Sequence, residues 1–167
     1  MNRTLSNRTL RSIALIIFAA LSTAAASAQS LSIHTEDGKE TKIGKAEIAK
    51  LKRVTLKVSD HGKDAVFEGV LLADVLKLGG LELGEKLRGK QLAAFLLVEA
   101  ADNYKAVFAL PELDTGFMDK TVILADKRDG KDLPENARPW QIVSEGEKRA
   151  GRWVRQVVRL RIIRAGN

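Results

Sequence analysis

Alternating apolar and polar positions predict a mainly β protein from the first residues of the expected domain onward. Residues 31–35 alternate and are followed at residues 36–39 by a typical turn sequence, which predicts a first hairpin. Residues 45–51 then predict a short helix. Residues 54–58 alternate again and predict a half-buried strand, which ends at the polar residues 59–62.

The middle of the chain predicts one amphipathic helix and a second hairpin. Residues 70–78 place their apolar side chains on one helical face, and two glycines at residues 79–80 end this predicted helix. Residues 92–98 are apolar and uncharged, which predicts a central strand, and residues 104–110 predict its antiparallel partner. Proline at the start of residues 111–113 favours one helical turn there.

The C-terminal part predicts further strands around a polar loop. Residues 121–125 and 140–144 are apolar and β-prone, whereas the polar residues 126–138 predict a loop outside the core. Residues 153–163 alternate imperfectly; their β-branched residues favour a strand with an arginine-bearing solvent face, and a helix is the alternative. The whole pattern predicts a single α+β domain that is mixed and mostly β, with two or three short helices.

The N-terminus has the features of a secretory signal. It combines a basic start, an apolar run at residues 13–21 and small residues at positions 26–28. The run is shorter than the roughly 18 apolar residues that span a bilayer, although an uncleaved anchor is the alternative. We expect residues 1–28 to be removed, residues 29–167 to form the domain, and the protein to be periplasmic or secreted, with a membrane contact only through the signal.

The expected mature chain is modestly basic and contains no cysteine. Three of the 28 Lys and Arg residues lie in the predicted signal, which leaves 25 against 21 Asp and Glu, a balance of +4. The absence of cysteine excludes disulfides, and expected export together with few aromatic residues disfavours nucleic acid as a partner. Basic residues gather near the end of the chain and could meet an anionic ligand, an acidic protein or a membrane surface; they are Lys148, Arg149, Arg152, Arg155, Arg159, Arg161 and Arg164.

Short stretches of this chain occur in an order that resembles the oxidoreductase molybdopterin-binding domain, the catalytic-domain fold of the sulfite oxidase family. The resemblance extends over residues 50–163 and rests on residues 67–76, 101–104, 125–134, 138–143 and 151–155. It implies a sulfite-oxidase-like fold and molybdopterin as the cofactor. In that family polar loops hold the pterin phosphate, and one cysteine thiolate binds the molybdenum.

The metal ligand of the family has no counterpart in this sequence. By position the ligand would fall near Val58 or Ser59. Valine has no lone pair to offer, and a serine hydroxyl is a poor ligand for a soft, thiolate-preferring centre. We therefore predict no protein-ligated metal and assign no catalytic residue, so that enzymatic activity stays undecided, whereas binding of a pterin without the thiolate bond stays open.

The resemblance implies two arginines as cofactor-binding candidates near the C-terminus. Arg152 and Arg155 lie in a segment similar to the family's Arg-x-Val-Lys, with Arg155 in place of the lysine. Guanidinium groups can bind phosphate through two parallel hydrogen bonds. The alternative is that both arginines are solvent-facing residues of a terminal strand.

Loop residues complete the predicted binding set. Asp102-Asn103-Tyr104 resembles the family's Asp-Gly-Tyr, in which asparagine can adopt the left-handed conformation of the glycine, and Asp129-Gly130 resembles its Asn-Gly turn. Residues 138–141 resemble Gly-x-Pro-x-Arg, but Gln141 replaces the arginine, so Arg138 is the candidate there. His61 joins the set because its loop lies beside the expected pocket. Ordinary hairpin turns explain the loop residues equally well.

Other groupings give weaker predictions. Ser59-Asp60-His61 contains the residue types of a catalytic triad, but neighbours in sequence cannot form the relay, so a hydrolase lacks a nucleophile and base. His34 and His61 are the only histidines, and their spacing does not support a zinc site. The leading hypothesis is an exported domain that binds a pterin-type anion without being a self-sufficient molybdenum enzyme. The alternative is an interaction module that docks an acidic redox protein through its basic C-terminal face.

Overall fold

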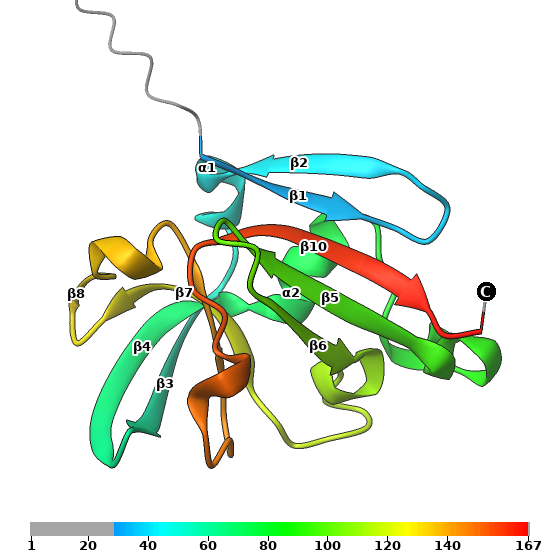
Figure 1. Cartoon of the computed structure of the whole chain (residues 1–167). Coiled ribbons are helices and arrows are strands. Elements are labelled where there is room, and N and C mark those ends of the chain that lie inside the picture. Colours follow the sequence, from blue (N-terminus) through cyan, green and yellow to red (C-terminus); the bar gives the residue numbers. More distant parts are fainter. Residues whose placement is uncertain (1–28, 167) are drawn as a thin grey trace, which may run out of the picture.

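A computed structural model describes residues 29–166, which form two five-stranded sheets and several short helices (Figure 1). The predicted signal at residues 1–28 lies outside the described residues. No helix within residues 29–166 combines the length and apolar character needed to cross a membrane. The α+β class expected from the sequence agrees with this sheet-rich arrangement.

The first sheet, sheet A, contains both ends of the described chain. Its order is β2 (Glu40–Gly44), β1 (Ser30–His34), β10 (Val157–Arg164), β5 (Ala94–Ala100) and β6 (Lys105–Ala109). The β1–β2 and β5–β6 hairpins confirm the two hairpins predicted from sequence. The only parallel pairing among the described strands joins β1 to β10, so the C-terminal strand lies between the two hairpins.

The second sheet, sheet B, is antiparallel. Its order is β3 (Arg53–Asp60), β4 (Lys63–Leu71), β7 (Val122–Arg128) and β8 (Lys131–Asp132), and β9 (Gln141–Ser144) also pairs with β7. The sequence did not predict β4, because this strand runs into the apolar residues assigned to the following helix. Gly69 lies where the β4–β7 register shifts, and a Cβ atom at Gly69 would stand 2.2 Å from a β7 carbonyl oxygen. Close contact between these strands therefore requires glycine.

The helices are short and close the ends of the sheets. Helix α1 spans Lys45–Ile48 and confirms the predicted first helix in a shorter form. Helix α2 spans Leu72–Leu78, so the prediction of a helix from residue 70 was wrong for its first two residues, which end β4. The predicted turn at residues 111–113 is part of η3. The five 3-10 helices are η1 (Gly84–Lys86), η2 (Gly89–Ala93), η3 (Leu110–Leu113), η4 (Glu135–Ala137) and η5 (Ala150–Arg152).

Two apolar clusters hold the sheets together. The larger one joins the inner faces of both sheets to α2 and contains Trp140, and the smaller one covers the other face of sheet B and contains Phe67 and Trp153. Trp153 packs edge-on against Phe67, with 5.7 Å between the ring centroids. Leu133 and Ala137 are fully buried in the smaller cluster, so the prediction that residues 126–138 lie outside the core was wrong for these two.

Strand β10 explains the imperfect alternation seen in the sequence. Its pairing with β5 shifts register between Val157 and Arg159, and Val158 and Arg159 are both exposed between the buried Val157 and Leu160. One inserted residue of this kind is a β-bulge, which reverses the order of inward and outward positions along a strand. The predicted strand is confirmed over residues 157–163, whereas residues 153–156 precede it as a loop.

Candidate functional site

A cavity of about 840 Å³ opens where the β3–β4 turn and the β5–β6 turn meet the segment that leads into η5. This volume is typical of sites that bind small molecules. Asp102, Gln141 and Trp153 reach it from three different parts of the chain. The other lining residues are Ser59, Asp60, His61, Gly62, Tyr104, Glu147, Lys148, Arg149, Ala150, Gly151 and Arg155.

Left-handed turn residues shape two sides of the cavity. His61 has φ 52° in the β3–β4 turn, and Asn103 has φ 69° in the β5–β6 turn. The latter value confirms that asparagine occupies a left-handed position there. Asp102 accepts a hydrogen bond from the backbone N–H of Tyr104 at 2.9 Å, and the Tyr104 hydroxyl donates to the carbonyl oxygen of Gly151 at 2.5 Å. These contacts fix the β5–β6 turn against η5.

Three cations line the cavity without an internal partner. Within residues 29–166, Lys148, Arg149 and Arg155 make no ion pair and no side-chain hydrogen bond, and all three are exposed. Two of the acidic residues that line the cavity are already neutralised. Asp60 pairs with Arg128 at 2.8 Å, and Glu147 pairs with Lys120 at 3.0 Å. The unbalanced charge that faces the cavity is therefore positive.

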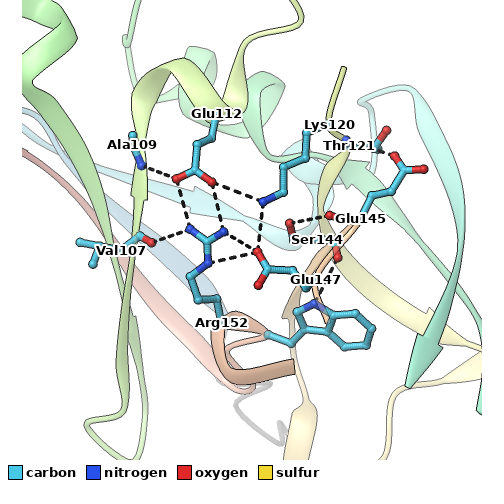
Figure 2. A network of polar contacts seen from close by, with 10 residues as sticks. Val107, Ala109, Glu112, Lys120, Thr121, Ser144, Glu145, Glu147 and Arg152 are labelled. Carbon is cyan, nitrogen blue, oxygen red and sulfur yellow. Dashed lines mark hydrogen bonds and ion pairs between the residues drawn. The ribbon is translucent and has the colours of Figure 1, made fainter. Parts of the chain in front are cut away.

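Arg152 lies outside the cavity lining and between two carboxylates (Figure 2). Its guanidinium donates to both carboxylate oxygens of Glu112 at 3.1 Å, to Glu147, and to the carbonyl oxygen of Val107 at 3.2 Å. It also stacks 4.5 Å from the centre of the Phe108 ring. Every N–H-bearing nitrogen of this guanidinium thus has a protein partner, and little of it is free to bind a ligand.

The charges around Arg152 stabilise one another. Burial raises the pKa of Glu112 and of Glu147, but the hydrogen bonds and positive charges of Arg152 and Lys120, joined for Glu112 by the Ala109 N–H, together outweigh burial, and both pKa values lie below the ordinary 4.5. The hydrogen bond to Glu112 raises the pKa of Arg152. Lys120 completes the network through contacts of 3.3 Å to Glu112 and 3.0 Å to Glu147. The network of these four side chains, with the bond from Arg152 to Val107, fastens the end of η5 to η3 and β6.

Most of the remaining basic cluster is also paired. Glu99 is buried on β5 and contacts Lys105 at 3.2 Å, Arg159 at 2.9 Å and Arg161 at 3.7 Å. Arg164 pairs with Glu36 at the end of β10. Of the seven clustered basic residues, the only ones without a partner in the described chain are the three that line the cavity. Within this basic cluster, the cations that have no carboxylate partner therefore all lie at the cavity.

The structure brings together half of the residues predicted from sequence. His61, Asp102, Tyr104 and Arg155 line the cavity, and Asn103 lies in the same turn without lining it.

Three predicted residues lie elsewhere. The backbone N–H of Val66 donates to Asp129 at 2.9 Å, which fastens the β7–β8 turn to β4, and Arg138 donates from Nε to the carbonyl oxygen of Leu133 at 2.5 Å. Arg152 lies in its ion-pair network. These three residues do not converge with the others on one cavity, because each makes contacts that hold the fold.

Sequence reasoning missed other lining residues. Lys148 and Arg149 belonged to the basic cluster, but no motif separated them from its paired members. The motif comparison marks Gln141 only as a replacement for the family's arginine, although the structure places its side chain in the cavity wall. The sequence shows only how far Lys148 and Arg149 lie from acidic residues along the chain. This distance does not predict which cations lack an ion-pair partner in the folded protein.

The donor set of the cavity suits an oxyanion better than a soft metal. Lysine and arginine provide the charge-assisted hydrogen bonds that phosphate groups accept. Among residues 29–166 no group of three or more His, Cys, Asp or Glu side chains could hold a metal ion. Ser59 lines the cavity near the position of the family's thiolate, but it offers only a hydroxyl. The residues present fit the phosphate of a pterin and do not fit its thiolate-bound metal.

Comparison with known proteins gives a likeness in fold. The sequence matches no family model and no curated protein. The structure is similar to the crystal structure of the sulfane dehydrogenase SoxCD from Paracoccus pantotrophus, with a TM-score of 0.62 and 19% sequence identity. The chain has a molybdopterin-oxidoreductase-like fold. The match covers 80% of this chain and 37% of that chain, so the likeness extends over little more than a third of the enzyme.

Proposed function

We propose that this protein is an exported molybdopterin-oxidoreductase-like domain that binds a phosphate-bearing, pterin-type anion in the cavity lined by Lys148, Arg149 and Arg155. The single observation that carries the proposal is the position of these three unpaired cations. The domain binds its ligand without the protein–metal bond that the related enzymes use. It is therefore a binding or carrier domain and not a self-sufficient molybdenum enzyme.

Electrostatics supports an anionic ligand at this place. A site in which two of the three lining acids are neutralised, while three cations remain without partners, concentrates positive potential at its opening. Two of the cations are arginines, whose planar guanidinium can hold two phosphate oxygens at once. The cavity, at about 840 Å³, has room for a fused-ring ligand together with its phosphate.

The fold supports a pterin as the organic part of this ligand. Sulfane dehydrogenase has the same fold, and the sequence resemblance to the molybdopterin-binding domain points to the same cofactor class. A bound molybdenum cofactor supplies oxygen-atom transfer chemistry in that family. Here the chain contributes phosphate binding and walls for the ring, but it has no cysteine with which to hold the metal.

Docking of an acidic redox protein is the competing function. It needs free positive charge on the C-terminal face, yet Arg152, Arg159, Arg161 and Arg164 are all held by carboxylates of the same chain. Each of these arginines is therefore held by at least one carboxylate, whereas the cavity cations have no such partner in the described chain. The cavity cations are therefore the better candidates for binding.

The test is to express the full chain in a host that makes molybdenum cofactor and to measure what the purified protein carries. We expect bound pterin and phosphate close to one per chain, and processing near Ala28 if the predicted signal is used. Arg149→Glu and Arg155→Glu should remove the pterin, because each places a negative charge beside the phosphate. Arg88→Glu is the matched control, since Arg88 is exposed, has no ion pair in the described chain and does not line the cavity.

Four results would count against the proposal. Wild-type protein purified without bound pterin or phosphate would show that the domain has no such ligand. Charge-reversed variants that keep the pterin would show that it binds outside this cavity. Salt-sensitive loss of an acidic protein partner in Arg155→Glu, with no small ligand to lose, would favour docking. Stoichiometric molybdenum with turnover of sulfite or methionine sulfoxide would show that the domain is an enzyme.

A further inference from the structure

Gln141 is a buried polar side chain in the cavity wall whose hydrogen-bonding capacity is unused. Its exposed fraction is 5%, and it lines the cavity together with Trp153. No side-chain hydrogen bond to Gln141 is found anywhere in residues 29–166, although its amide has two donors and an acceptor oxygen. The amide atoms of Gln141 are not among the buried side-chain atoms that lack a partner in residues 29–166, so they reach the cavity and are free to pair with a ligand.

The position of Gln141 on β9 explains why the side chain lies there. Side chains alternate between the two faces of a strand, and Val143, two residues further along, packs in the smaller apolar cluster with Trp153. Gln141 shares this face, at the end of the strand where the cluster meets the cavity. Backbone pairing of Gln141 with Ala125 of β7 fixes its place in the sheet. The amide is thus held by a rigid element and not by a loop.

The chemistry of an amide selects a particular kind of partner. A primary amide can donate and accept at the same time, which matches the edge of a lactam or another amide, where a donor and an acceptor stand side by side. A ligand that covers this amide must also pair with it, because a polar group left unpaired in the bound complex costs free energy. Trp153 offers an apolar wall beside the amide.

We infer that Gln141 is a specificity-determining residue that recognises a neutral lactam or amide edge on the ligand, while the cations at the cavity bind its phosphate. This inference rests on the proposed function and defines the ligand more narrowly. The ligand class is a phosphate ester that carries an uncharged heterocycle with adjacent donor and acceptor atoms. Gln141 is neutral and stands in the place of the family's arginine. It therefore favours a ligand with a neutral lactam or amide edge over a ligand with a second negatively charged group.

The experiment compares three phosphate monoesters by calorimetric titration of the purified protein. Neopterin phosphate has the lactam edge, 1-naphthyl phosphate has a fused ring without it, and glycerol phosphate has no ring. The wild type should bind neopterin phosphate about tenfold more tightly than 1-naphthyl phosphate, the effect of one or two hydrogen bonds. Gln141→Met keeps the length of the side chain and should abolish this preference, with unchanged affinity for glycerol phosphate.

Each outcome separates the inference from the proposed function. If none of the three esters binds the wild type, both fail together. If the esters bind but neopterin phosphate has no advantage over 1-naphthyl phosphate, or keeps its advantage in Gln141→Met, the inference is wrong and the phosphate site stands. Should Gln141→Met not fold, the comparison of the two fused-ring esters on the wild type decides the question alone.

Discussion

Replacing Arg152 with methionine tests whether this residue holds the fold or a ligand. Methionine preserves most of the side-chain length and the contact with Phe108 but removes the guanidinium. Glu112 and Glu147 both accept hydrogen bonds from Arg152, so the substitution leaves these two carboxylates with Lys120 as their remaining cationic partner. We expect a clear loss of stability at neutral pH.

The structure sets the size of this loss. Breaking a fully buried ion pair by removing one partner costs about 3–5 kcal/mol. The side chain of Arg152 is 32% exposed and that of Glu147 is 13% exposed, so solvent reduces the cost. Lys120 remains 3.0 Å from Glu147 and compensates part of the exposed charge. The expected destabilisation is about 2–3 kcal/mol, which lies between the buried and the surface cases.

Urea unfolding of the purified protein measures this value. A loss of this size lowers the urea midpoint by about 1 M for a domain with an ordinary dependence on denaturant. Arg155→Met is the matched control, because Arg155 is exposed and has no ion pair in the part of the chain that the structure describes; its stability should change by less than about 0.5 kcal/mol. Adding Glu147→Gln to Arg152→Met should restore part of the stability, since one uncompensated charge disappears.

The reasoning is refuted if Arg152→Met unfolds at the same urea concentration as the wild type. It is equally refuted if Arg152→Met loses pterin while its stability is unchanged, because Arg152 would then contact the ligand as the sequence resemblance implied. If both arginine variants destabilise the protein to the same extent, the network has no special role.

Three further predictions concern stability. Because the pKa values of Glu112 and Glu147 are lowered in the folded protein, their contribution is complete above the ordinary value of 4.5 and is lost as pH falls through the lowered values; unfolding at about pH 7, 4 and 3 should show a steeper acid loss for the wild type than for Arg152→Met. Gly69→Ala should cost about 1–3 kcal/mol or more through its clash with β7, whereas Gly151→Ala, which meets no atom within 4 Å, should be neutral in the same urea assay. Glu99→Gln should cost about 1–3 kcal/mol by urea unfolding, since the charge-assisted hydrogen bonds from β6 and β10 are lost; an unchanged midpoint would show that those cations are fully solvated already.

Local patterns predicted most of the strands, and tertiary packing decided the rest. Hairpins with short polar turns were found correctly, because alternation and turn chemistry both act over a few residues. Strand β4 was missed because it continues without a break into α2, and its last apolar residues fit a helical face as well as a buried strand. Leu133 and Ala137 are single apolar residues in a polar segment, and only the folded chain shows that they cover Phe67 and Trp153.

The candidate site was predicted in part for a physical reason. Turn residues such as Asp102 and His61 can be located from sequence, because turns leave clear signals. Which arginine is free and which is paired depends on carboxylates far away in the chain, as Glu112 is for Arg152. The sequence therefore identified a basic region correctly but could not separate Arg155 from Arg152, although only two residues lie between their positions in the chain.

The contacts of Arg152 and Glu112 also protect an exposed border of the molecule. Strand β6 is the last strand of sheet A, a position where unpaired backbone groups can recruit a strand from another molecule and start aggregation. Arg152 bonds the carbonyl oxygen of Val107, and Glu112 accepts from the N–H of Ala109, so two backbone groups of this strand are already occupied. The salt-bridged pair of Arg152 and Glu112 thus leaves fewer free backbone groups on the β6 edge with which a strand of a neighbouring copy could pair.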